Sequence, residues 1–284
     1  MTVKELRVSF VNELSKIYEQ EEVLSLFYML TEAIIGYTRI EVAVNLSKKL
    51  TNDEVERFAE TLKRLKTQEP IQYIIGEVHF YESSFFVDKN VLIPRPETEE
   101  LVDWIVKDQK GRQNSLKILD IGTGSGCVAI SLAKSLPNAK VYALDVSEKA
   151  LEVAKKNAMK NQVAVKFVKE DILETKSLFQ NFDIIVSNPP YVRELEKQEM
   201  KPNVLDNEPS GALFVSDNDP LLFYNKITAL AQKSLLDNGK LYFEINQYLG
   251  EETKSMIEDK GFVAVDLRKD MYGNDRMIRA SLTK

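Results

Sequence analysis

Hydrophobic spacing divides the chain into two differently organised parts. Over residues 1–69 the apolar positions recur at helical intervals, and this stretch contains one glycine and no proline. Three of its segments open with Thr-x-x-Glu, at Thr2, Thr38 and Thr51. In this spacing the Thr hydroxyl accepts a hydrogen bond from the backbone N–H three residues later. The Glu at that position accepts in return from the backbone N–H of the Thr. The pattern predicts a small helical bundle, which we interpret either as a solvated cap on a larger domain or as a partner-recognition module.

The pattern changes after Gly76. Residues 78–81 and 85–87 are strand-like, flank Glu82-Ser83-Ser84 and predict a short β-hairpin. The lone histidine, His79, falls in the first strand and is interpreted as a strand or packing residue. Pro96 and the acidic residues after it suit the first turn of a helix. The predicted parts are a helical region 1–76, a hairpin linker 77–92 and a larger domain 93–284.

The larger part alternates strands and helices. Short apolar runs that predict strands occupy residues 116–121, 140–145, 163–168, 182–187, 240–245, 262–267 and 277–281, and most are separated by helical segments. We expect Asp237-Asn238-Gly239 to end the helix before the fifth of these strands. The alternation predicts an α/β fold with a doubly wound, mostly parallel, seven-stranded sheet. Ligands of such sheets bind at the carboxyl ends of the strands.

The composition of the chain excludes several kinds of functional site. The 284 residues carry 38 Lys and Arg against 44 Asp and Glu, a formal net charge of −6, which argues against bulk nucleic-acid binding. One cysteine, Cys127, excludes an internal disulfide and a Cys-rich zinc site, and one histidine excludes a multi-histidine metal site. Without a signal peptide or a long apolar run, we expect a cytoplasmic protein that uses neither metal nor membrane.

A glycine-rich turn follows the first strand of the larger part, in the sequence Asp120-Ile-Gly-Thr-Gly-Ser-Gly126. Its glycines let the backbone turn tightly and approach a ligand, but G-x-G-x-G departs from the dinucleotide pattern G-x-G-x-x-G. Asp145 ends the second strand and could accept hydrogen bonds from both hydroxyls of a ribose. Asp171 follows the third strand and could accept a hydrogen bond from the amino group of an adenine. For each acidic residue the alternative is a helix cap or a solvated loop.

Asn188-Pro189-Pro190-Tyr191 directly follows the fourth strand, at the same sheet edge. A plain strand-terminating turn is the alternative interpretation. The residue types suit a planar NH₂ group, which is a poor nucleophile because its lone pair is delocalised. The Asn188 side-chain oxygen and the Pro189 carbonyl can each accept one of its hydrogens and stabilise positive charge that develops on nitrogen. Tyr191 can stack on the planar group, and no dedicated base is needed.

The chain resembles the class I S-adenosylmethionine-dependent methyltransferases, which have a Rossmann-like fold. The resemblance lies in the order of three features: a glycine turn after the first strand, an Asp at the end of the second and an Asp after the third. The resemblance implies a cofactor site in which the glycine turn borders the methionine moiety, Asp145 binds the ribose and Asp171 with Ile172 borders the adenine. The residues implied in cofactor binding are Asp120, Gly122, Thr123, Gly124, Gly126, Asp145, Asp171, Ile172 and Asn188.

Methyltransferases that act on adenine, guanine or glutamine nitrogens share the Asn-Pro-Pro-Tyr motif. Nearly the whole chain is similar to the peptide chain release factor glutamine methyltransferases. This similarity is carried by the helical N-terminal region, the hairpin, Ile93–Glu99, the glycine turn, Asn188–Tyr191, Glu208-Pro209 with Ala212-Leu213, and Asp270–Arg276. Two departures stand out, at Phe214–Asp219 where a Gly-rich stretch is frequent, and at Asn246 where Gly is common.

That resemblance implies methyl transfer from S-adenosylmethionine to the side-chain amide nitrogen of the glutamine in the Gly-Gly-Gln motif of class I peptide chain release factors. Residues 1–76 then contact the release factor, residues 93–284 carry catalysis, and the product is S-adenosylhomocysteine. The acceptor is bound by Asn188, Pro189, Pro190 and Tyr191, of which Asn188, Pro189 and Tyr191 are the expected catalytic residues. An adenine- or guanine-directed DNA or RNA methyltransferase is the alternative, and a non-enzymatic scaffold is a third. We expect a monomer without direct nucleic-acid binding.

Overall fold

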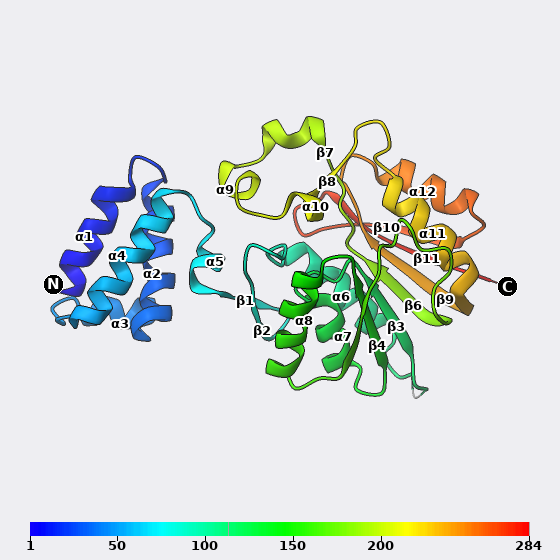
Figure 1. Cartoon of the computed structure of the whole chain (residues 1–284), viewed down its shortest axis with the longest axis horizontal. Helices are drawn as coiled ribbons and strands as arrows, with labels where there is room; N and C mark the ends of the chain where they lie inside the picture. The colour runs from blue at the N-terminus through cyan, green and yellow to red at the C-terminus, as the bar shows by residue number, and fades with distance from the viewer. Residues whose placement is uncertain (113, 284) are drawn as a thin grey trace. The chain divides into compact units, whose positions relative to one another are not determined.

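The computed structural model describes residues 1–112 and 114–283 and divides the chain into two compact units (Figure 1). The first unit comprises Met1–Gly76 and Pro202–Asn207, and the second comprises Glu77–Lys201 and Glu208–Lys284. The three-part division expected from the sequence stays a prediction. Across the described residues, no helix combines the length and the apolar character that crossing a membrane requires.

The first unit is a helical bundle, as predicted. Its helices are α1 (Val3–Leu14), α2 (Gln20–Ile35), α3 (Arg39–Val44), α4 (Asn52–Lys66), α5 (Ile71–Ile75) and α9 (Pro202–Leu205). Thr2, Thr38 and Thr51 each form the predicted reciprocal cap with the Glu three residues later. The core centres on Phe10, which meets the rings of Phe27 and Phe58 edge to face at centroid distances of 5.5 and 6.1 Å.

The second unit is built on a seven-stranded sheet with the order β10-β11-β9-β6-β3-β4-β5. Its strands are β3 (Lys117–Ile121), β4 (Lys140–Asp145), β5 (Val165–Lys169), β6 (Phe182–Ser187), β9 (Leu235–Glu244), β10 (Val263–Lys269) and β11 (Asp275–Ser281). β11 is antiparallel to both of its neighbours, whereas β3, β4, β5, β6 and β9 run parallel. The predicted mostly parallel, doubly wound α/β sheet is confirmed.

Helices cover both faces of this sheet (Figure 1). They are α6 (Pro96–Asp108), α7 (Cys127–Ser135) and α8 (Glu148–Lys160) on one side, and α11 (Leu222–Ser234) and α12 (Gly250–Asp259) on the other. Successive strand residues point to opposite faces, so Ile118 packs in the cluster that contains Leu101 of α6, while Leu119 packs with Tyr224 of α11. Parallel strands buried on both faces explain the continuous apolar runs in the sequence.

The predicted hairpin is present as β1 (Glu77–Phe80) and β2 (Ser83–Phe86), and His79 lies exposed in β1 opposite Ser84. Asn157 of α8, which is fully buried, attaches the hairpin to the sheet domain. Its Oδ1 accepts the N–H of Phe86 at 2.6 Å, and its Nδ2 donates to the Phe86 carbonyl at 3.0 Å and to the Ser125 carbonyl at 2.8 Å. The hairpin is thereby tied to the glycine-rich turn.

Two features differ from the sequence-based expectation. The strand expected at residues 240–245 begins at Leu235, so Asp237-Asn238-Gly239 lies within β9. The pairing of β9 with β6 nevertheless shifts register between Phe182 and Ile184, and Asn238 has a positive φ of 59°, so these residues form a bulge. Besides α9 of the first unit, the segment after β6 adds four short elements that periodicity cannot detect, namely β7 (Val192–Arg193), η1 (Glu194–Glu199), α10 (Ser210–Leu213) and β8 (Phe214–Val215). The departure at Phe214 thus starts with a strand paired to β7.

Candidate active site

A cavity of about 350 Å³ lies in the second unit, where β3, β4, β5 and β6 end. It brings together most of the predicted site residues. Its lining includes Asp120, Gly122, Thr123, Gly124, Asp145, Asp171, Ile172, Asn188, Pro189 and Pro190. Of the described residues predicted for the site, Gly126 and Tyr191 are not among those that line it.

The glycine turn is held against the end of β4. The N–H groups of Gly122 and Thr123 both donate to the Leu144 carbonyl, at 2.8 and 3.0 Å. Gly126 has a φ of +81°, and a Cβ there would lie 2.9 Å from Ile130 Cδ1 and 3.1 Å from Ala154 Cβ. Gly126 is therefore required for the close packing of the turn against α7 and α8, beside the cavity rather than in its wall.

Asp145 connects the glycine turn to the start of α8. Its Oδ2 accepts the N–H of Gly124 at 2.9 Å, and its Oδ1 accepts the N–H of Ser147, the N-cap of α8, at 2.8 Å. Burial raises the pKa of Asp145 above its usual range. Each carboxylate oxygen has a further lone pair, so both can accept from neighbouring hydroxyls of one ligand.

Asp120 places a second carboxyl group on the cavity wall. It is 2% exposed, and the Thr123 hydroxyl donates to its Oδ2 at 2.6 Å. Burial, together with the negative charge of Asp145, raises the pKa of Asp120 to about 7. Two carboxyl groups in one cavity, that of Asp120 buried and that of Asp145 half-buried, favour a ligand with positive charge.

Asp171 and Ile172 form a further part of the wall, beyond the end of β5. Asp171 is exposed, and its Oδ1 accepts the N–H of Leu173 at 2.9 Å, which fixes the local turn. Ile172 is buried and offers an apolar surface. This pairing of a polar edge with an apolar face suits a flat heterocyclic ring.

Asn188 sits at the end of β6, half-buried and on the cavity wall. Its Nδ2 donates to Thr98 Oγ1 at 3.3 Å. Its backbone carbonyl lies 4.0 Å from the position a Cβ would take at Gly122, so the motif and the glycine turn approach each other closely.

Tyr191 is directed into the protein. Its hydroxyl donates to Glu244 Oε1 at 3.0 Å, and burial together with the Glu244 charge raises its pKa. The Tyr191 carbonyl accepts from Asn246 Nδ2 at 2.9 Å. Asn246 is 2% exposed and also donates to both oxygens of Glu196, at 3.0 and 3.1 Å. Asn246 therefore holds the end of the Asn-Pro-Pro-Tyr segment in place.

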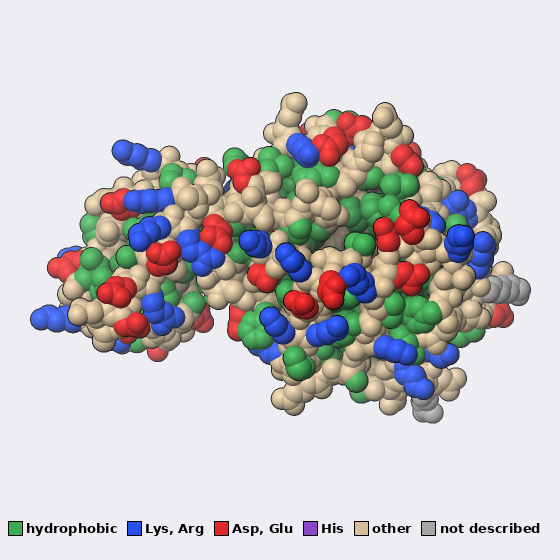
Figure 2. All heavy atoms as spheres, viewed as in Figure 1, with side chains coloured by type: hydrophobic (Ala, Val, Ile, Leu, Met, Phe, Trp, Pro, Cys, Tyr) green, Lys and Arg blue, Asp and Glu red, His purple; other side chains and the backbone are tan. Residues whose placement is uncertain are grey.

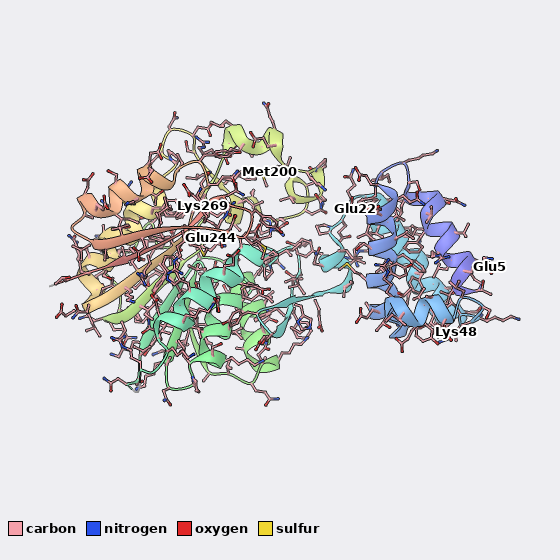
Figure 3. The ribbon with its side chains drawn as sticks, turned by 180° about the vertical axis from the view of Figure 1, so that it is seen from behind. Glu5, Glu22, Lys48, Met200, Glu244 and Lys269 are labelled. Atoms are coloured by element: carbon pink, nitrogen blue, oxygen red, sulfur yellow. The ribbon has the colours of Figure 1, made fainter. Side chains whose placement is uncertain are left out.

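Sequence reasoning missed two residues behind Asn188 and left the role of Arg95 and Glu208 open. Thr98 and Glu244, both buried, are joined by a hydrogen bond of 2.6 Å, and Glu244 is labelled in Figure 3, within the second unit. A usable signal was present, because Glu244 is an acidic residue in the otherwise apolar run 241–245. Such a residue requires buried partners.

Comparisons with solved structures support the fold. A methyltransferase from Pyrococcus furiosus matches with a TM-score of 0.52 at 20% identity, covering 80% of this chain and 100% of that chain. The 16S rRNA N2 G1207 methyltransferase of T. thermophilus, solved with AdoMet and guanosine, matches with a TM-score of 0.54 at 18% identity, covering 72% of this chain and 49% of that chain. The second unit therefore has the fold of the class I methyltransferases, with a cavity at its strand ends.

The family follows from sequence relatives. The family described as Methyltransferase small domain matches residues 98–209, and the PrmC N-terminal domain matches residues 5–76. A release factor glutamine methyltransferase of Flavobacterium psychrophilum is 54% identical over 283 residues, covering 99% of each chain. One from Bacteroides thetaiotaomicron is 45% identical over 269 residues, covering 94% of this chain and 96% of the relative. The chain belongs to the release factor glutamine methyltransferase family, as its resemblance predicted.

Proposed function

We propose that this protein transfers a methyl group from S-adenosylmethionine to the side-chain amide nitrogen of the glutamine in the Gly-Gly-Gln motif of class I peptide chain release factors. The observation that carries the proposal is the position of Asn188 and Pro189 on the same cavity wall as Asp145 and the glycine turn. An amide-binding motif and a candidate cofactor site thus share one cavity in a member of this family.

The residues present fit the cofactor. S-adenosylmethionine supplies an electrophilic methyl group on a positively charged sulfur. Asp120 with Gly122, Thr123 and Gly124 of the glycine turn would hold its methionine portion, where the carboxyl groups complement its positive charges, and Gly126 would support this turn from behind. Asp145 would accept from the ribose hydroxyls, and Asp171 with Ile172 would border the adenine.

The acceptor amide needs two fixed hydrogen-bond acceptors. Asn188 would offer its side-chain oxygen and Pro189 its carbonyl, whose direction is restrained by the fixed φ of proline. Held in this way, the nitrogen can present its lone pair to the methyl group, and both oxygens stabilise the positive charge that develops on it. The methylated nitrogen is acidic and loses its proton without a dedicated base. Pro190 lines the cavity and would shape the acceptor pocket, while Tyr191 supports the segment from within.

A protein acceptor also agrees with the charge of the chain. The net charge is −6, and Figure 2 shows lysine and arginine side chains interspersed with acidic ones over the visible face. A nucleic-acid substrate would be favoured by clustered positive charge instead. We assign release-factor recognition to the helical region 1–76, catalysis to residues 93–284, and the role of connector to the hairpin linker 77–92.

Mass spectrometry of a class I release factor, incubated with the protein and S-adenosylmethionine, tests the proposal. We expect one added methyl group on the Gly-Gly-Gln glutamine, and none on a release factor in which this glutamine is replaced by glutamate. Asn188→Ala should bind the cofactor normally and lower the rate about 10²- to 10³-fold, as the loss of one transition-state hydrogen-bond partner does elsewhere. Methyl transfer to DNA or RNA but not to the release factor would refute the proposal.

A further inference from the structure

A buried hydrogen-bonded chain runs behind Asn188 through Thr98 to Glu244. Ser187 of β6 pairs with Phe243 of β9, so Asn188 and Glu244 occupy the next positions at the carboxyl ends of adjacent strands. Thr98 lies in the first turn of α6, accepts from Asn188 Nδ2 at 3.3 Å and donates from Oγ1 to Glu244 Oε2 at 2.6 Å. Residues far apart in sequence thereby converge on the side chain that we propose to bind the acceptor amide.

The hydroxyl of Thr98 determines which way the Asn188 amide faces. A hydroxyl has one proton, and the 2.6 Å contact with the Glu244 carboxylate takes it, because a carboxylate is the stronger acceptor. The Thr98 oxygen is then left with lone pairs alone for Asn188. Only the NH₂ side of the Asn188 amide can bond to it, so the amide oxygen is turned away from Thr98.

Glu244 is itself held from its other side. Its Oε1 accepts the Tyr191 hydroxyl at 3.0 Å, and its backbone carbonyl accepts the Tyr224 hydroxyl at 3.2 Å. The residue is 1% exposed, so its carboxylate cannot exchange these partners for bulk water; burial raises the pKa of Glu244, and the hydrogen bonds from Thr98 and Tyr191 oppose this by favouring its charged form. A buried carboxylate fixed by two hydroxyl groups accounts for the glutamate at the end of an apolar strand.

We propose that Thr98 and Glu244 are positioning residues that orient the Asn188 amide, so that its oxygen rather than its NH₂ group faces the acceptor nitrogen. The inference rests on the proposed function and adds to it the means by which Asn188 is set. Without the Thr98 hydroxyl, the amide can rotate by half a turn and present donors to the acceptor's own NH₂ group. Neither positioning residue needs to touch the acceptor.

Thr98→Val tests the role of the hydroxyl, because valine keeps the shape of threonine and removes the oxygen. We expect kcat for release-factor methylation to fall about 10- to 100-fold, the range for a misaligned reacting group. The affinity for S-adenosylmethionine, measured by calorimetry, should stay near that of the wild type. Thr98→Ser keeps the hydroxyl and should restore most of the rate. A Thr98→Val enzyme with the wild-type kcat, or a serine variant as slow as the valine variant, would overturn the inference.

A double-mutant cycle distinguishes positioning from general support of the fold. Because Thr98 acts through Asn188, adding Thr98→Val to Asn188→Ala should cause little further loss of kcat. Losses that multiply in full would mean that Thr98 acts independently, which contradicts the inference. In Glu244→Gln the new amide must donate to one of the two hydroxyl partners of Glu244, so this variant should also have a lower kcat. In the Thr98→Val background the same substitution should lower kcat much less.

The wild-type protein in the same assay separates the two proposals. If the wild type methylates the release factor and Thr98→Val is unaltered, the positioning role alone is refuted. If the wild type transfers no methyl group to the release factor, the proposed function fails, and the positioning role fails with it.

Discussion

The guanidinium of Arg95 lies 2.5 Å from a carboxylate oxygen of Glu208, whose side chain is 1% exposed. The other oxygen of this carboxylate accepts the backbone N–H of Ile93 at 3.2 Å. Arg95 and Pro209, which follows Glu208, both line the cavity. The pair Arg95–Glu208, 113 residues apart in sequence, therefore joins two segments of the chain that line the candidate active site.

Glu208→Ala is expected to lower the free energy of unfolding of the second unit by about 2 kcal/mol, because it leaves the Ile93 N–H and the Arg95 guanidinium without their partner. Trp104 is the sole tryptophan and is buried in α6 of this unit, so its fluorescence during urea unfolding reports the change. Glu252→Ala, at an exposed position of α12, is the matched control and should be near neutral. Equal stability of the two variants would contradict the bridging role of Glu208.

Local signals in the sequence predicted the elements of the fold. The caps at Thr2, Thr38 and Thr51 depend on residues three positions apart, and the alternation of strands and helices depends on short apolar runs. The carboxyl-end rule then placed Asp145 and Asn188 on one cavity. These inferences succeeded because each rests on spacing that the chain itself fixes.

The remainder of the site depends on contacts that no local pattern specifies. Thr98 and Glu244 are 146 residues apart and meet because α6 packs beside β9. Tyr191 could be singled out from the sequence motif, but the direction of its side chain could not, because it depends on a hydrogen bond to Glu244 on another strand. The early start of β9 was missed because a bulge at 236–239 interrupts the pairing and resembles a turn in sequence.

Gly126→Ala should destabilise the second unit more than Gly124→Ala. Both glycines have positive φ, +81° and +55°, so alanine is strained at either position. At Gly126 the added Cβ would also lie 2.9 Å from Ile130 Cδ1, whereas none of the described atoms beyond the chain neighbours lies within 4 Å of it at Gly124. We expect the two variants to differ by about 1–3 kcal/mol in urea unfolding, the cost of overpacking.

The Gly124 variant has an effect of its own on ligand binding. Gly124 lines the cavity, so its added methyl group should weaken binding of S-adenosylmethionine in calorimetry although the fold is retained. Equal losses of stability at Gly124 and Gly126 would show that the contact with Ile130 relaxes without cost.

Asp120 should make the protein less stable as the pH rises. A salt-bridged carboxylate, whose pKa is lowered, has the opposite effect. Its pKa is about 7 in the folded protein against an ordinary value of 3.8, so between these pH values the folded state holds a proton that the unfolded state has released. The free energy of unfolding therefore falls as pH rises from about 4 to 7, by on the order of 4 kcal/mol for this group. The stabilisation that the proton on Asp120 provides is complete below pH 4 and lost above pH 7.

Asp120→Asn removes this titration. Urea unfolding without cofactor, followed by Trp104 fluorescence at several pH values from 5 to 8, should show the variant gaining stability relative to the wild type as pH rises. A difference between the two proteins that does not change with pH would refute the raised pKa of Asp120.

Asn246→Gly, which removes the side-chain amide, should destabilise the protein. It removes the donor to the Tyr191 carbonyl and to the Glu196 carboxylate, which is 8% exposed. Glu196 keeps its ion pair with Arg193, so the cost of about 1–3 kcal/mol comes mainly from leaving the Tyr191 carbonyl without a donor. Asn246→Asp is the informative second variant, because it keeps the side-chain volume but places a carboxylate against Glu196. Its loss should exceed that of glycine at pH 8 and diminish as the pH falls, since protonating one carboxyl group restores a donor. Urea unfolding at pH 8 and pH 5 measures both effects, and a glycine variant as stable as the wild type would show that Asn246 does not hold the Asn-Pro-Pro-Tyr segment.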